Sequence, residues 1–273
     1  MPAGLWVARP GTMGFMTAPA QTPDPVSAPA ASARRLVEAR YGDGLAAVLG
    51  GSAAGGRFTA RSDLDIAVLL PEGGRNRRET VRHEGRTAEV FLHTAADLRT
   101  LFTEGRANRR ATMAFLYAGS VPLHDPHGLA AERCRVARAL IAAGPVPLTA
   151  AARDDSRYLL TDLAEDLAGT EGLGQDPHEQ LALADRTLRE AAHLFSAVRG
   201  AWSGAGKWLP RRLRAAEPVL GAALLDGHLA VARHGEPGPL CAAAHTVLGL
   251  VGGPLREGLV HTRGPGRPGT AGG

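Results

Sequence analysis

The stretch LGGSAAGGRFTARSDLDIAVLL, residues 49–70, constrains the fold of this chain more than any other. It contains the end of one apolar run, residues 45–49, and all of a second, residues 66–70, with glycine and arginine between them. Short apolar runs bounded by glycine or proline are typical of buried strands. The stretch therefore predicts two strands joined by a tight, glycine-rich connection.

Two acidic residues, Asp63 and Asp65, stand at the start of the second apolar run. Side chains alternate between the faces of a strand, so both carboxylates point to the same side, about 7 Å apart along the chain. Carboxylates this close repel each other unless a positive charge lies between them. A hard divalent cation such as Mg²⁺, which takes oxygen ligands from carboxylates and substrate phosphates, meets that need. The pair therefore predicts a metal site.

A phosphate-binding loop is predicted directly after the first apolar run. Gly50 and Gly51 let the backbone approach a ligand closely, because they carry no Cβ. Ser52 is expected to cap a short helix that begins there. Free N–H groups at the N-terminus of a helix attract phosphate. One short segment thus offers a phosphate cradle followed by a metal-binding pair.

This combination resembles the nucleotidyltransferase superfamily that includes DNA polymerase beta. The signature of that superfamily is Gly-Ser, about ten residues, and then Asp-x-Asp on a strand. Here Gly51-Ser52 is followed by ten residues, of which the last is the usual serine, Ser62, before Asp63. The superfamily also needs a third carboxylate on a neighbouring strand, and Glu89 in RTAEVFLH stands in that place. Many members have aspartate there, and glutamate looks more like the antibiotic-modifying branch.

The resemblance implies an α+β fold, with a small mixed β-sheet nucleotidyltransferase domain and flanking helices followed by an all-α helical bundle, as in aminoglycoside nucleotidyltransferases. It implies an enzyme that moves a nucleoside monophosphate from an NTP to a hydroxyl of a small, aminoglycoside-like acceptor, with release of pyrophosphate. The expected donor is ATP, and the expected transferred group is AMP. Two Mg²⁺ ions would be bound by Asp63, Asp65 and Glu89. Gly51 and Ser52 would hold the β- and γ-phosphates.

Three more site residues are predicted from their chemistry. Arg61 lies in the loop and could reach the triphosphate, or be an ordinary solvated residue. Lys207 is the one lysine among 31 basic residues. Lysine binds phosphate as a compact point charge. Similar Lys-Trp segments occur in bacterial proteins of this type. The helix over residues 153–167 offers Asp162 as a general base for the acceptor hydroxyl. A solvated acidic helix face is the alternative, and such a face would also suit a polycationic acceptor.

Hydrophobic patterning and breaker residues predict the remaining elements. Besides the two strands, we expect a helix over 30–41, hairpin strands over 79–83 and 87–93 around Glu84-Gly85, one helix over 95–117, a strand over 121–123 and a helix over 128–143. Beyond residue 148 we expect helices alone, over 149–167, 179–198, 207–216, 217–232 and 240–250. The predicted organisation is a disordered tail (1–29), a catalytic domain (30–145), a helical acceptor-binding domain (146–260) and a disordered tail (261–273).

Composition narrows the classes of partner and location. The net charge of +4 and the pI of about 9.7 are compatible with nucleic acid. No basic stripe with interleaved aromatic residues is present, so nucleic acid is an unlikely partner. No apolar run reaches the roughly 18 residues of a membrane-spanning helix. Two cysteines fit a reducing, cytoplasmic setting. The expected partners are a nucleotide and a small-molecule acceptor, and a homodimer is left open.

Alternative functions remain at this point. One is an antitoxin-like enzyme that nucleotidylates a partner protein, and another is a non-catalytic nucleotide-binding regulator. The run Gly50-Gly51-Ser52-Ala53-Ala54 also resembles the nucleophile elbow of a serine hydrolase. That hydrolase interpretation leaves the Asp63/Asp65 pair unexplained, and it ranks far below nucleotidyl transfer.

Overall fold

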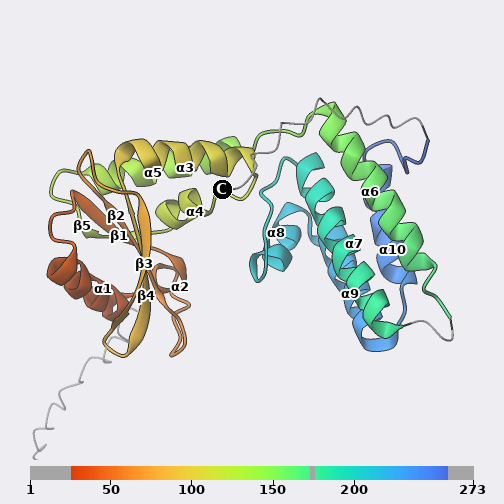
Figure 1. Cartoon of the computed structure of the whole chain (residues 1–273), viewed down its shortest axis with the longest axis horizontal. Helices are drawn as coiled ribbons and strands as arrows, with labels where there is room; N and C mark the ends of the chain where they lie inside the picture. The colour runs from red at the N-terminus through yellow and green to blue at the C-terminus, as the bar shows by residue number, and fades with distance from the viewer. Residues whose placement is uncertain (1–25, 173–175, 258–273) are drawn as a thin grey trace, which may run out of the picture.

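The computed structural model describes residues 26–172 and 176–257 (Figure 1). Its N-terminal part contains α1 (Ser27–Arg40), β1 (Ala46–Leu49), α2 (Gly51–Ala54), β2 (Leu64–Leu69), β3 (Arg77–His83), β4 (Arg86–His93), α3 (Ala95–Ala107), α4 (Thr112–Ala118), β5 (Val121–His124) and α5 (Leu129–Ala143). Its C-terminal part contains α6 (Ala150–Ala168), α7 (Pro177–Val198), α8 (Trp208–Ala216), α9 (Pro218–His234) and α10 (Gly238–Gly249). The predicted tail over 261–273 lies outside the described residues, as does 1–25, and α1 begins inside the predicted N-terminal tail.

The five strands form one mixed sheet in the order β3-β4-β2-β1-β5. Strands β2 and β4 run parallel, and the other neighbours are antiparallel. The hairpin β3-β4 turns at Glu84 and Gly85, whose φ angles of 48° and 76° are both left-handed. Two left-handed residues form the turn that matches the twist of a hairpin. The predicted mixed sheet, with helices after it, is confirmed.

Helices cover both faces of the sheet, which explains why its central strands are apolar at nearly every position. Leu49 and Ile66 pack with α1 on one face. Val48 and Ala67, the alternate residues, pack with α3, α4 and α5 on the other face. The acidic residues of interest therefore lie at the ends of strands whose middles are fixed on both sides.

The prediction of a single helix over 95–117 is wrong. Helix α3 ends at Ala107 and α4 begins at Thr112. Between them Arg109 and Ala111 take left-handed φ angles of 63° and 46°, and the chain turns so tightly that a Cβ on Gly105 would lie 2.9 Å from Ala111 Cα. Hydrophobic spacing continues across this turn, so the periodicity did not reveal it.

Helices α6 to α10 share a second core, whose buried members lie between residues 160 and 248. All five helices were predicted, with ends that differ by a few residues. In Figure 1, α8 lies on the side of this helical part that faces the sheet, and α6 lies on the opposite side. The predicted domain boundary near residue 145 stays a prediction, and the separate cores support it.

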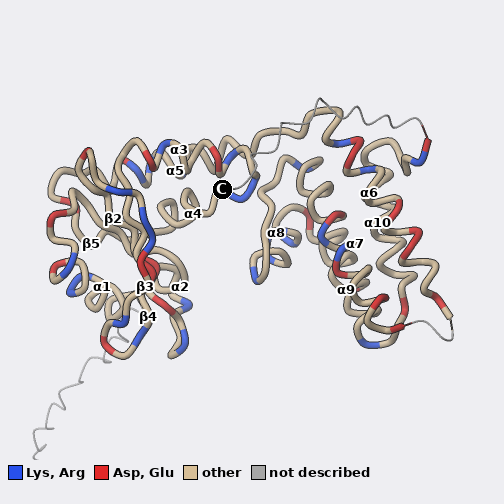
Figure 2. The backbone as a smooth tube through the Cα atoms, in the orientation of Figure 1, with Lys and Arg blue, Asp and Glu red and all other residues tan. Residues whose placement is uncertain are grey.

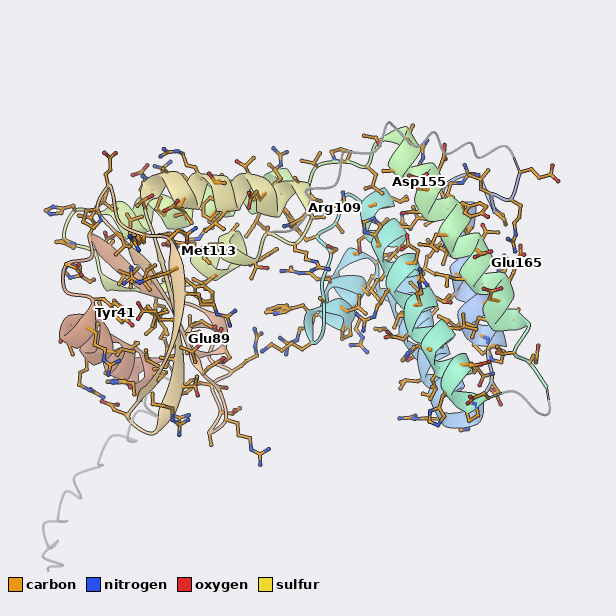
Figure 3. All side chains as sticks on the ribbon, viewed as in Figure 1. Tyr41, Glu89, Arg109, Met113, Asp155 and Glu165 are labelled. Carbon is orange, nitrogen blue, oxygen red and sulfur yellow. The ribbon has the colours of Figure 1, made fainter. Side chains whose placement is uncertain are left out.

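Trp202 and Arg109 both make contacts between the helical part and the N-terminal part. Trp202, between α7 and α8, is buried in the core formed by α3, α4 and α5, and its Nε1 donates to the Ile141 carbonyl at 3.1 Å. Arg109 lies at the junction (Figure 3) and is only 2% exposed. Its guanidinium donates to three carbonyls on the far side of the turn, those of Val146, Ser196 and Ala201.

No helix within the described ranges is both long enough and apolar enough to cross a membrane.

Candidate active site

The register of the parallel strands brings two of the predicted acids together. Asp65, the second residue of β2, has Glu89 of β4 as its direct partner. Partners on adjacent strands point to the same face and lie about 4.8 Å apart. Asp63 precedes β2 and shares the side of Asp65. One carboxylate oxygen from each of these three residues lies within 4.8 Å of the other two. We call Asp63, Asp65 and Glu89 the acidic cluster.

The acidic cluster is short of positive charge. Burial of the Asp65 carboxyl, followed by the charges of Asp63 and Glu89, raises the pKa of Asp65 to about 6. Lys207 and Arg78 lower this pKa, but they do not cancel the rise. Three oxygen donors that converge at this distance, with an unfavourable excess of negative charge, fit a hard divalent cation.

Lys207 is the N-cap residue of α8 and belongs to the helical part of the chain. Its side chain is exposed, yet its positive charge lowers the pKa of Asp65 in the sheet. Lys207 therefore acts on the acidic cluster from across the junction between the two parts of the chain. Its role in binding phosphate stays a prediction.

Gly51 is required by its close approach to Asp65. Its φ angle is 62°, which L-residues with a Cβ rarely adopt, and a Cβ there would lie 1.8 Å from Asp65 Oδ2. The neighbouring Gly50 N–H donates to the Asp65 carbonyl at 2.8 Å. The glycine loop and the acidic cluster are thus in direct contact.

The prediction that Ser52 caps this helix is wrong. Gly50 is the N-cap residue, and no side chain caps α2. The strand-to-helix turn is made by the left-handed Gly51, so Ser52 falls inside the first turn. Its side chain is half-buried, and its hydroxyl has no hydrogen-bond partner among the residues that the structure describes. This hydroxyl is available to a ligand.

Arg61 is exposed and lies two residues before the acidic cluster. Within the described residues, no hydrogen bond or ion pair fixes its side chain. The loop itself is held by Arg86 of β4, which donates to the carbonyls of Thr59 at 3.1 Å and Ala60 at 3.0 Å. The contribution of Arg61 to nucleotide binding stays a prediction.

Sequence reasoning missed Arg78, which forms an ion pair with Glu89. Its guanidinium also lies 5.3 Å from the centre of the Phe91 ring. The hairpin register pairs Arg78 with Phe91 and Thr80 with Glu89, so Arg78 is the diagonal neighbour of Glu89 on one face. The predicted turn at Glu84-Gly85 determines that register, because it fixes which residues of the two strands pair.

The structure does not bring Asp162 to the acidic cluster. Asp162 lies on α6, where it forms an ion pair with Arg256 at 2.8 Å. Figure 3 shows Glu165, one turn along α6, on the opposite side of the molecule from Glu89. In Figure 2 acidic residues recur along α6, far from the sheet. The predicted general base therefore has no geometric support, because packing of the helices turned α6 outward.

Comparison with known proteins assigns the N-terminal part. Residues 31–112 match the family model of the nucleotidyltransferase domain, and this span includes the whole acidic cluster. Among solved structures, a nucleotidyltransferase-like protein from Exiguobacterium sibiricum 255-15 has 12% sequence identity and a TM-score of 0.41, over 81% of this chain and 73% of that chain. No curated protein matches the chain. Residues 31–112 are thus similar to the nucleotidyltransferase domain.

Proposed function

We propose that this protein catalyses Mg²⁺-dependent transfer of a nucleoside monophosphate from an NTP to a hydroxyl of a small molecule, with release of pyrophosphate. AMP is the transferred group that we expect. The observation that carries the proposal is the convergence of three carboxylates within 4.8 Å beside the Gly50-Gly51-Ser52 loop. It lies within the residues that match the nucleotidyltransferase domain.

The proposed reaction is a single displacement at phosphorus. The acceptor oxygen attacks the α-phosphorus, the bond from that phosphorus to the β-phosphate oxygen breaks, and pyrophosphate leaves. The hydroxyl proton passes to water or to a carboxylate of the acidic cluster. Divalent ions held by Asp63, Asp65 and Glu89 would stabilise the charge that develops on the entering and leaving oxygens.

The chain's own groups bind and orient the reactants in this proposal. The backbone N–H groups of Gly51 and Ser52 and the free Ser52 hydroxyl would hold the β- and γ-phosphates beside the acidic cluster, which the loop contacts at Asp65. Lys207 adds a positive charge from the helical side. Arg78 holds the Glu89 carboxylate in place through its ion pair.

The test combines binding and turnover. Melting temperature is measured with each NTP, with and without Mg²⁺, and pyrophosphate release is then measured with a panel of hydroxyl compounds. Wild type should gain stability with one NTP in Mg²⁺, and Asp63→Asn should lose both this gain and turnover while its fold remains intact. Asp43→Asn, an exposed aspartate after α1, is the matched control.

The outcomes separate the candidate functions. Equal NTP stabilisation and turnover in wild type and Asp63→Asn would refute the proposal. NTP stabilisation without turnover on any acceptor would favour the non-catalytic regulator.

The nature of the acceptor needs a separate argument. An aminoglycoside-like acceptor stays a prediction, and the acidic helix face that would suit a polycation lies on α6, on the opposite side of the molecule from Glu89 (Figure 3).

A further inference from the structure

A pocket of about 350 Å³ lies where α7, α8, the turn between α3 and α4, and the segment before α8 meet. Its polar side chains come from both parts of the chain and include Asn108, Arg110, Arg189, His193, Ser203 and Arg212. Within the described part of the chain, no aspartate or glutamate lines it. We call it the junction pocket, and its lining is strongly cationic.

Arg212 is the central cation of the junction pocket. It is half-buried, and its guanidinium lies 3.5 Å from the centre of the Phe115 ring. Burial lowers the pKa of Arg212, but an arginine keeps its charge in proteins. No carboxylate in the described residues forms an ion pair with it. Stacking occupies the face of the guanidinium and leaves its edge N–H donors for a ligand.

Two further arginines flank this central group. Arg189 of α7 uses its Nε to pair with Asp185 at 2.8 Å, which leaves its terminal nitrogens unassigned. Arg110 is exposed and has no side-chain partner in the described ranges. Ala192 and Leu213 supply buried apolar surface to the lining. The pocket therefore offers fork-shaped donors against an apolar wall, the geometry that carboxylate and phosphate groups fit.

A series of contacts through α4 and α8 links the junction pocket to the glycine loop and the acidic cluster. Leu116 of α4 lies against the glycine loop, since a Cβ on Gly50 would be 2.7 Å from Leu116 Cγ. The preceding residue, Phe115, holds Arg212. On α8, the Arg212 guanidinium lies 5.4 Å from the centre of the Trp208 ring. Trp208 directly follows Lys207, whose charge acts on Asp65.

We propose that the junction pocket binds an anionic group, phosphate or carboxylate, on the molecule that accepts the nucleotidyl group. This inference rests on the proposed function, which assigns the phosphates of the NTP to the glycine loop and the acidic cluster. A second anion site, linked to them through α4 and α8, is then left for the acceptor. The same three arginines would repel a polycationic acceptor, so the substrate class is an anionic hydroxyl compound.

The first experiment tests the anion site without metal or nucleotide. Inorganic phosphate is titrated into the full chain in EDTA, and binding is measured by calorimetry. Arg212→Gln should weaken phosphate binding about 10- to 100-fold, since hydrogen bonds to charged groups contribute roughly 1.5–3 kcal/mol. The matched control is Arg211→Gln, an exposed neighbour on α8 that also contacts Trp208 but does not line the pocket. It should bind phosphate as wild type does.

Two more variants keep the test valid if Arg212→Gln does not fold. Arg212→Lys preserves the charge and loses the fork, and it should retain part of the affinity. Arg110→Gln changes an exposed side chain and should weaken binding about 3-fold, as one partly screened charge would. Phosphate binding that is the same in all these variants and in wild type would overturn the inference.

The second experiment assigns the anion to the acceptor. Pyrophosphate release with Mg²⁺ and ATP is compared for a hexose phosphate, a hydroxy acid and the parent neutral sugar. The anionic compounds should be used, and Arg212→Gln should raise KM for them without changing KM for ATP. Displacement of phosphate by ATP in EDTA would instead identify the pocket as a triphosphate site and overturn the acceptor assignment.

The proposed function can fail separately. If no NTP stabilises the protein in Mg²⁺ while phosphate binding still depends on Arg212, nucleotidyl transfer is refuted and the anion site is supported. If an NTP binds through Asp63 but phosphate binding does not depend on Arg212, the proposed function survives and the anion site is refuted.

Discussion

Replacement of Arg109 by alanine should weaken the whole molecule, because one side chain holds three segments together. The Arg109 guanidinium donates to the carbonyls of Val146 at 2.6 Å, Ser196 at 3.1 Å and Ala201 at 3.0 Å. Its own carbonyl accepts hydrogen bonds from the N–H and the hydroxyl of Ser203, both at 2.9 Å. Alanine keeps the backbone contacts and removes the three side-chain bonds.

The expected magnitude follows from the groups left behind. A buried polar group without a partner costs roughly 1–3 kcal/mol. The Ser196 carbonyl keeps a second bond from the Ala201 N–H at 2.8 Å, so the lower figure applies to it. Arg109 Nε is itself buried without a partner, and its removal recovers about 1 kcal/mol. The net loss in the free energy of unfolding should be about 3 kcal/mol.

The assay is urea unfolding followed by fluorescence, with Trp202 as a reporter at the junction. Arg99→Ala, an exposed arginine on α3, is the control and should change stability by less than about 0.5 kcal/mol. If the two parts uncouple, the variant should unfold in two steps, visible as two transitions in the fluorescence. A loss below about 1 kcal/mol with a single transition would refute the reasoning that Arg109 joins the two parts.

Two other predictions concern the glycine loop and a buried histidine. Gly51→Ala should abolish nucleotide binding because its Cβ would displace Asp65. Gly85→Ala puts a Cβ on another glycine with a left-handed φ angle, but in open space, so this control should retain binding. The rise in melting temperature with Mg²⁺ and NTP measures binding in both variants. His93 bonds to the Tyr117 hydroxyl at 2.7 Å, and burial lowers the pKa of His93 to about 4. The unfolded chain therefore takes up a proton at higher pH than the native one, so stability should fall as pH drops from about 6.5 towards 4. The raised pKa of Asp65 acts in the opposite direction over the same range, so the histidine is isolated by comparing wild type with His93→Gln. Between pH 7 and pH 5, wild type should lose about 2 kcal/mol of unfolding free energy relative to His93→Gln in urea unfolding.

The acidic cluster could be predicted because its determinants are local. The spacing from Gly51 to Asp63 and the alternation on one strand depend on short-range geometry, and Glu89 stands on the next apolar strand. The first two features depend on local sequence alone, whereas Glu89 reaches the cluster through the parallel pairing of β2 and β4. The helices of the C-terminal part were also predictable, because hydrophobic periodicity and glycine and proline breaks are features of short sequence segments.

What the sequence did not reveal depends on long-range packing. Lys207 and Asp162 were both predicted as site residues from their chemistry. Only the packing of the helices distinguishes them, because α8 lies on the side that faces the sheet and α6 lies on the opposite side. The break between α3 and α4 is held by Arg109, whose partners are distant in sequence. The junction pocket is built from α7, α8 and the turn at residues 108–110, which no local pattern connects.

The burial of Trp202 in the N-terminal core has a consequence for synthesis of the chain on the ribosome. Its ring meets Phe115 edge-on, with centroids 5.7 Å apart, yet it is translated after α6 and α7. The N-terminal part must therefore leave the exit tunnel with this part of its core unfilled. We expect the early domain to remain dependent on its C-terminal neighbour until residue 202 emerges, and premature termination within α7 to yield a product that chaperones and proteases recognise.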